Sequence, residues 1–107
     1  MKSALDLRTL GMDPSPALEA AVRERVARLD HVCPGIASCR VTVESLHKHQ
    51  HQGHPYEVRL DVTRPGLPPL QARAQSEDAH LAVRDAFDAM TRQATDAQAR
   101  QRDTAQT

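Results

Sequence analysis

The stretch from Tyr56 to Met90, YEVRLDVTRPGLPPLQARAQSEDAHLAVRDAFDAM, decides the fold of this chain. Its first part alternates between apolar and polar side chains, which predicts a strand with one buried face. Arg64-Pro65-Gly66 predicts a turn, and Pro65 to Pro69 is expected to join this strand to a shorter one over Leu70, Ala72 and Ala74. The stretch therefore predicts a hairpin that leads directly into a helix.

That helix is expected to begin at Ser76-Glu77-Asp78. Glu77 and Asp78 are expected in its first turn, where negative charge complements the helix dipole. Apolar residues then recur at helical spacing and form one stripe along the helix. The members of the stripe are Ala79, Val83, Ala86, Phe87, Met90 and Ala94.

The N-terminal half adds two strands and a second helix. Leu5 and Leu7 alternate with charged residues, which predicts a short first strand. Ser15-Pro16 suits a helix start, because the hydroxyl can accept a free amide and proline is tolerated at the first helical position. Pro34-Gly35 ends this helix, whose apolar stripe is Leu18, Val22, Val26 and Leu29. In the next predicted strand, the side chains of Cys39, Val41 and Val43 are expected to face the core.

The predicted order is β-α-β-β-β-α. This order predicts an α+β two-layer sandwich, in which two helices cover one face of a four-stranded sheet. Residues 1–97 are expected to form a single domain, and residues 98–107, which lack an apolar stripe, a disordered or frayed tail. The other face of the sheet is lined by Arg8, Arg40, Thr42, Glu44, Arg59, Asp61 and Arg73.

Composition limits the classes of function. The chain has 14 basic and 14 acidic residues, so its formal net charge is zero, whereas proteins that bind nucleic acid through phosphates usually carry a basic excess. Phe87 and Tyr56 are the only aromatic residues, which argues against base stacking on an aromatic platform. No apolar run approaches the ~20 residues that span a bilayer, and the N-terminal residues lack the apolar segment of a signal peptide. A cytoplasmic protein without a membrane partner is expected.

Neither the spacing of the cysteines nor any sequence motif indicates a catalytic site. Cys33 and Cys39 do not have the spacing of a redox or zinc motif, and free thiols are the default in the cytosol, with a disulfide as the alternative. The chain has no G-x-S-x-G, no H-E-x-x-H and no glycine loop that could cradle phosphate. We therefore expect no enzyme activity, no cofactor and no small-molecule substrate.

Several of these residues carry a family resemblance. The order of elements, Pro16-Ala17-Leu18, Tyr56-Glu57-Val58-Arg59, Pro65-Gly66, Ser76-Glu77-Asp78 and Arg92-Gln93 are similar to the ribosome hibernation-promoting factors, which include the ribosome-associated inhibitor and the sigma-54 modulation proteins. The resemblance covers roughly residues 1–97. It implies a short member of the family with a fold like that of double-stranded RNA-binding domains, which read shape and phosphates more than sequence.

The resemblance implies a translation inhibitor that acts in stationary phase or stress. It would bind the small ribosomal subunit, through rRNA and ribosomal proteins, in the channel used by mRNA and tRNA. Arg25, Arg28 and Arg92 match basic positions of the family. The chain departs from the family pattern at Ala89 and Asp96, where lysine is usual, and at His80, where an aromatic residue is usual. Each lost phosphate contact lowers affinity and its dependence on salt.

Intrahelical ion pairs offer another account of these arginines. Glu24 precedes Arg28 by four residues and Asp88 precedes Arg92 by four, a spacing that stabilises a solvated helix face without any ligand.

The histidine-rich segment between the second and third strands is the other candidate site. Imidazole is a common ligand of zinc, copper and nickel, so His47, His49, His51 and His54 form an alternative metal site and predict, as an alternative function, a small metal-binding or metal-responsive module. A flexible polar loop explains the same residues without a ligand. A third account, which fits the family, has Lys48 and its histidine neighbours donating hydrogen bonds to RNA phosphates.

A protein-interaction module is a further class of function that fits the predicted sheet. A first strand at the sheet edge would present unpaired amides to a partner, which includes a homodimer formed through a sheet edge.

Overall fold

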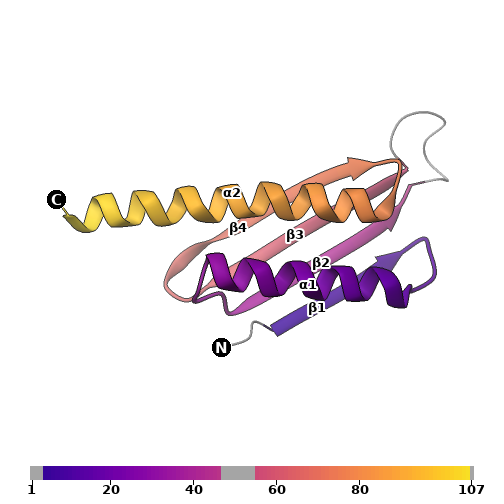
Figure 1. Ribbon diagram of the computed structural model, residues 1–107, viewed down its shortest axis with the longest axis horizontal. Helices are drawn as coiled ribbons and strands as arrows, with labels where there is room; N and C mark the ends of the chain where they lie inside the picture. The colour runs from indigo at the N-terminus through magenta and orange to yellow at the C-terminus, as the bar shows by residue number, and fades with distance from the viewer. Residues whose placement is uncertain (1–3, 47–54, 107) are drawn as a thin grey trace.

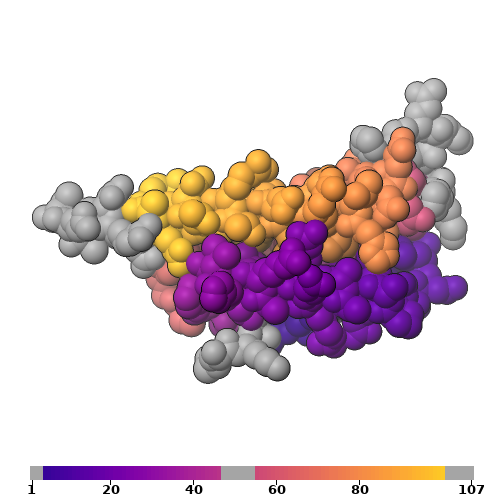
Figure 2. Space-filling view, in the orientation of Figure 1, coloured from indigo at the N-terminus to yellow at the C-terminus, as the bar shows by residue number. Residues whose placement is uncertain are grey.

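The computed structural model describes residues 4–46 and 55–106 of the protein, with side chains through Arg100 (Figure 1). Its elements are β1 (Ala4–Leu10), α1 (Pro16–Val32), β2 (Ser38–Ser45), β3 (Tyr56–Arg64), β4 (Leu67–Ser76) and α2 (Ala79–Gln106). The predicted order β-α-β-β-β-α and the α+β class are confirmed. Both helices cover one face of the sheet, and they lie side by side along it (Figures 1 and 2).

The strands follow the order β1-β2-β3-β4 across a mixed sheet. β1 pairs with β2 in parallel because α1 carries the chain back to the same end of the sheet, while β2, β3 and β4 pair antiparallel. Gly11, which follows β1, has φ +71°, and a Cβ there would lie 2.9 Å from the carbonyl oxygen of Ser45. Glycine is therefore required where the chain leaves β1 past the end of β2.

The hairpin between β3 and β4 is tighter than the sequence indicates. β4 begins at Leu67, so the connection is only Pro65-Gly66 rather than the five residues to Pro69, and Gly66 takes a positive φ of 73°. Pro68 and Pro69 lie within an edge strand, which tolerates the missing amide donors.

One hydrophobic core fills the space between the helices and the sheet. The predicted stripe of α1 is buried, and so are the inward residues of β2 and β3. On α2 the buried positions are Ala82, Val83, Ala86, Phe87, Met90 and Ala94, so Ala82 joins the predicted stripe while Ala79 is only partly buried. Neither helix in the described part of the chain is long and apolar enough to cross a membrane.

The predicted start of α1 is confirmed, whereas the predicted start of α2 is wrong. The hydroxyl of Ser15 accepts a hydrogen bond from the amide of Leu18 at 3.2 Å, as predicted for α1. Asp78 instead precedes α2, and its Oδ1 accepts hydrogen bonds from the amides of His80 at 2.7 Å and Leu81 at 3.4 Å. The acidic pair is therefore not in the first turn of α2; Asp78 caps the helix from outside, where a carboxylate can reach its free amides.

The other end of α2 also differs from the predicted pattern. The backbone of residues 98–106 is helical, although the sequence predicts a disordered or frayed tail there. Alanine and glutamine are good helix formers, so this segment can continue a helix that is already nucleated by packing on the sheet.

Candidate nucleic-acid interface

The outward faces of α1 and α2 carry the arginines predicted to contact RNA. Because each helix turns its apolar stripe toward the sheet, the polar residues of both helices share one surface, on the helix side of the molecule (Figure 2). We call this surface the helix face. It presents the described positions Arg25 and Arg28 from α1 and Arg92 from α2.

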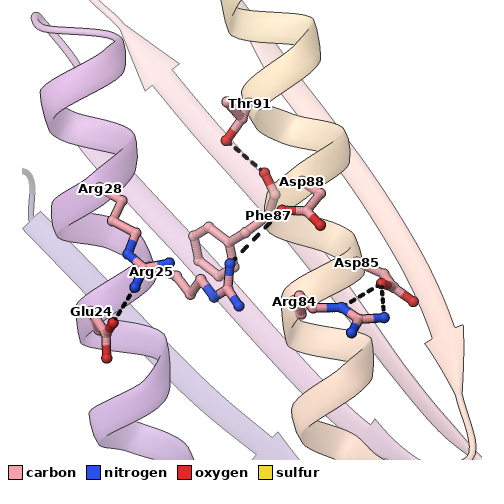
Figure 3. A network of polar contacts seen from close by, with 8 residues as sticks. All are labelled: Glu24, Arg25, Arg28, Arg84, Asp85, Phe87, Asp88 and Thr91. Atoms are coloured by element: carbon pink, nitrogen blue, oxygen red, sulfur yellow. Dashed lines mark hydrogen bonds and ion pairs between the residues drawn. The ribbon is translucent and has the colours of Figure 1, made fainter.

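Arg25 connects the two helices. Its Nη1 lies 3.8 Å from Oδ1 of Asp88, and Figure 3 shows the side chain extending from α1 toward α2. The side chain of Arg25 is only 28% exposed, so it is the least accessible of the three predicted arginines. Its position favours a role in joining the helices as much as in contact with a ligand.

Arg28 is the more accessible arginine of α1. Its Nη2 donates a hydrogen bond to Oε1 of Glu24 at 2.5 Å, which confirms the predicted pair, and both side chains are more than 60% exposed. An exposed ion pair of this kind contributes at most about 1 kcal/mol. Arg28 can therefore exchange Glu24 for a phosphate oxygen at low cost.

Arg92 has a different environment from the one predicted. The four-residue spacing predicts that Asp88 pairs with Arg92, but Asp88 faces Arg25 on the other helix. Arg92 is exposed, and no described carboxylate lies within ion-pair distance of its guanidinium. Its charge is thus available to an anionic ligand without the loss of an existing pair.

Two further arginines of the helix face were not among the predicted site residues. Arg23 donates two hydrogen bonds to Oε1 of Glu19, at 3.2 and 2.9 Å, and Arg84 donates two to Oδ1 of Asp85 (Figure 3). The four-residue spacing from Glu19 to Arg23 was a usable signal for the first pair. These pairs neutralise Arg23 and Arg84, so both arginines offer less free charge to an anionic ligand than Arg92 does.

On the opposite face of the sheet, arginines are also paired with carboxylates of neighbouring residues. Glu57 of β3 is 9% exposed, and its Oε2 accepts a hydrogen bond from Nε2 of Gln75 at 2.8 Å. The guanidinium groups of Arg59 and Arg73 lie 3.8 and 3.9 Å from the same carboxylate, and Arg59 also lies 3.5 Å from Glu44. These arginines are held by buried or partly buried carboxylates, so a phosphate would compete for them less easily than for Arg28.

The remaining predicted site residues lie outside the described part of the chain. They are Lys48 and the alternative metal ligands His47, His49, His51 and His54. Within the described residues, no group of three or more histidine, cysteine or acidic side chains could hold a metal ion. The metal site therefore stays a prediction, and the described geometry adds no cofactor site.

Comparisons with known proteins agree with this architecture. A solved ribosomal subunit interface protein from Coxiella burnetii superimposes with a TM-score of 0.72 at 21% identity, over 90% of this chain and 98% of that one. The N-terminal domain of Protein Y from Thermus thermophilus superimposes with a TM-score of 0.70 at 20% identity, over 89% of this chain and 97% of that one. At these identities the similarity shows the fold.

Sequence comparison extends from the fold to the family. Among curated protein sequences none matches this chain significantly. The family described as sigma 54 modulation protein / S30EA ribosomal protein, however, matches residues 5–102, a range that includes all six elements except the last turn of α2 and the first residue of β1. The chain therefore belongs to the sigma 54 modulation protein / S30EA ribosomal protein family.

Proposed function

We propose that this domain is a ribosome-associated translation inhibitor of the hibernation-factor type. It binds the small ribosomal subunit in the channel used by mRNA and tRNA, under stress or in stationary phase. The observation that carries the proposal is the family match over residues 5–102. The fold supports it, because a similar fold occurs in a protein named as a ribosomal subunit interface protein.

The helix face is the proposed contact surface. Arg92 supplies an exposed charge that no described carboxylate neutralises, and Arg28 supplies a second charge by leaving Glu24. Arg25 contributes from the seam between the helices, where Asp88 holds its guanidinium in place. Lys48 would extend the contact from the segment between β2 and β3. Phosphates satisfy such donors without reading base sequence, which suits binding to folded rRNA.

The proposed mechanism is steric and reversible. A folded domain in the decoding channel excludes mRNA and tRNA, so inhibition needs no bond to form or break and no cofactor. The family is a class of ribosome-associated proteins rather than a class of enzymes. A cytoplasmic location follows from the proposed partner.

Cosedimentation with purified small subunits, at low and at physiological salt, tests this surface. We expect saturable binding that weakens as salt rises, and Arg92→Gln should lower the affinity and reduce the slope of log K against log salt by about one. Arg28→Gln should have a smaller effect, because the unaltered Arg28 must give up its pair with Glu24 before it can bind a phosphate. Asp96→Lys, which restores the family charge, should strengthen binding and steepen the slope.

Arg40→Gln is the matched control. It removes the same charge from the opposite face of the sheet, where Arg40 lies 3.5 Å from Asp6, and it should leave binding unchanged. Equal losses for Arg40→Gln and Arg92→Gln would show that only net charge matters and would reject the helix face. No saturable binding at low salt would reject the proposed function itself.

A further inference from the structure

The two edges of the sheet differ in how they are protected against pairing with another strand. β4 begins with Leu67-Pro68-Pro69, where the prolines have no amide to donate, and the guanidinium of Arg64 already donates to the Pro68 carbonyl at 2.9 Å. β1 contains no proline, and no described element lies along its outer side (Figure 1). An edge strand of this kind is a template for pairing with another chain.

The direction of the free backbone groups on β1 follows from one hydrogen bond. The amide of Ala4 donates to the carbonyl of Ala37 at 3.1 Å, so Ala4 turns its backbone groups toward β2. In a parallel ladder alternate residues bond to the same neighbouring strand, which places Asp6 and Arg8 in the same set as Ala4. Leu5, Leu7 and Thr9 therefore direct their N–H and C=O groups away from the sheet.

A second copy of β1 satisfies these groups when it runs antiparallel with Leu7 opposite Leu7. Leu5 then lies opposite Thr9 in both directions, and all three outward residues form hydrogen-bonded pairs. Asp6 lies opposite Arg8 of the second copy, at the closely spaced positions where side chains of opposite charge interact best. Leu10, which is 44% exposed, lies opposite Ala4.

The other symmetric registers are less favourable. A centre at Asp6 or at Arg8 sets two like charges opposite each other, and a centre at Leu5 or at Thr9 leaves most of the strand unpaired. We propose that the protein forms a symmetric dimer in solution by antiparallel pairing of β1 with β1 of a second copy, with Leu7 on the two-fold axis. The charge pattern of β1 is complementary to itself in this register, which is why the occupant is a second copy.

A groove on the helix side of β1, lined by both apolar and polar side chains, gives the dimer some apolar surface to bury. It has a volume of about 370 Å³ and lies between β1 and the start of α1, lined in part by Leu5, Leu7 and Leu18. Leu5 and Leu7 are only partly buried in the single chain. In the dimer the second copy's leucines lie beside this groove and remove it from water.

The test is a measurement of molar mass by light scattering over a concentration series, without ribosomes. We expect a rise from the 11.8 kDa protomer to twice that mass. Arg8→Asp, which sets carboxylates opposite each other at two symmetric positions, should weaken the dimer about ten-fold or more. Arg73→Asp is the matched control, since it makes the same charge change on the same face near the other edge, and it should dimerise as the unaltered protein does.

Mixing two variants tests the register. Asp6→Arg alone should also weaken the dimer, because arginines then face arginines, whereas an equimolar mixture of Asp6→Arg and Arg8→Asp should recover a dimer containing one copy of each. A protein that stays at the protomer mass throughout the series would overturn the proposal. Dimers unaffected by Arg8→Asp, or a mixture that does not recover, would overturn this interface.

Hydrogen exchange provides a measurement that needs no variant. With rising concentration the amides of Leu5, Leu7 and Thr9 should become protected, while those of Asp6 and Arg8, already bonded to β2, should not change. Equal changes in protection at the alternate residues, or no change at any of them, would overturn the proposed pairing. Ribosome binding enters none of these measurements, so their outcome is separate from that of the proposed function.

Discussion

At Cys39, burial changes the chemistry of a thiol more than neighbouring charges do. The residue is 1% exposed, and the loss of hydration raises its pKa to about 11, with smaller contributions from the carboxylates of Asp30 and Asp61. Both cysteines are buried and free, which agrees with the expected reduced thiols rather than with a disulfide. A thiol that stays protonated and out of contact with solvent should react slowly with alkylating or disulfide reagents.

The raised pKa predicts how stability depends on pH. The folded state holds the Cys39 proton more tightly than the unfolded state does, whose thiol pKa is near 9.0. The stabilisation is therefore complete below pH 9 and is lost as pH rises toward 11, by about 1.4 kcal/mol for each unit between the two pKa values. Urea unfolding at several pH values, compared with Cys39→Ala, measures it. If the free energies of unfolding of the unaltered protein and of Cys39→Ala differ by the same amount from pH 8 to 11, the prediction is contradicted.

At the scale of one element, the start of α2 depends on a single side chain. Asp78 accepts hydrogen bonds from two amides of the first turn, whereas no described hydrogen bond involves the carboxylate of Glu77. Asp78→Ala should lower the free energy of unfolding by about 1 kcal/mol, and Asp78→Asn should retain most of it. Glu77→Ala, the control, should stay within about 0.5 kcal/mol of the unaltered protein. Chemical denaturation measures the free energy of unfolding of each variant. Equal losses for Asp78→Ala and Glu77→Ala would contradict capping by Asp78.

The elements themselves could be predicted because their signals are local. The alternation of Val58, Leu60 and Val62 and the stripe of α1 depend only on the spacing of nearby residues, and both are buried as expected. The pairing of Asp88 could not be predicted in this way. Arg25 and Arg92 both have the right chemistry for it, and only the packing of α1 against α2 brings Arg25 closer.

The same limit applies to the proposed interface. A charge count of zero describes the whole chain, but it does not say which arginines have neutralising neighbours. Arg28 could be paired with Glu24 from the spacing alone, whereas the exposed charge of Arg92 depends on where the other helix lies. The edge position of β1 likewise needed the sheet order, because β1 contains no proline or other local signal that would mark it as an edge strand.

At the scale of the molecule, α2 is longer than the sheet that it covers. Its 28 residues extend about 42 Å, while the ten residues of β4 extend about 33 Å, and the final turns project past the β3–β4 turn (Figure 1). The last residue of α2 that is fully buried among those described is Ala94. Residues 97–100, which follow it, are partly buried or exposed, so this part of α2 has less packing than the part that covers the sheet.

Truncation after Ala97 tests this division of the helix. We propose that residues 1–97 form the stable domain, so the truncated protein should fold with a free energy of unfolding lowered by no more than about 1 kcal/mol, since side chains 98–100 are at most partly buried. Truncation after Phe87, which removes the buried Met90 and Ala94, should cost several kcal/mol. Urea unfolding followed by circular dichroism measures both. Equal stability of the two truncated proteins would contradict the proposal.

The position of α2 in the chain also affects how the protein is made. β3 and β4 leave the translating ribosome before the helix that packs on them, so the apolar residues Val58, Leu60 and Val62 lack their final cover while the nascent chain is growing. A partly folded chain with uncovered strands of this kind is prone to aggregate and is a substrate for chaperones. The sheet can acquire its native cover only after α2 has been synthesised, which makes the last step of folding late in the life of the nascent chain.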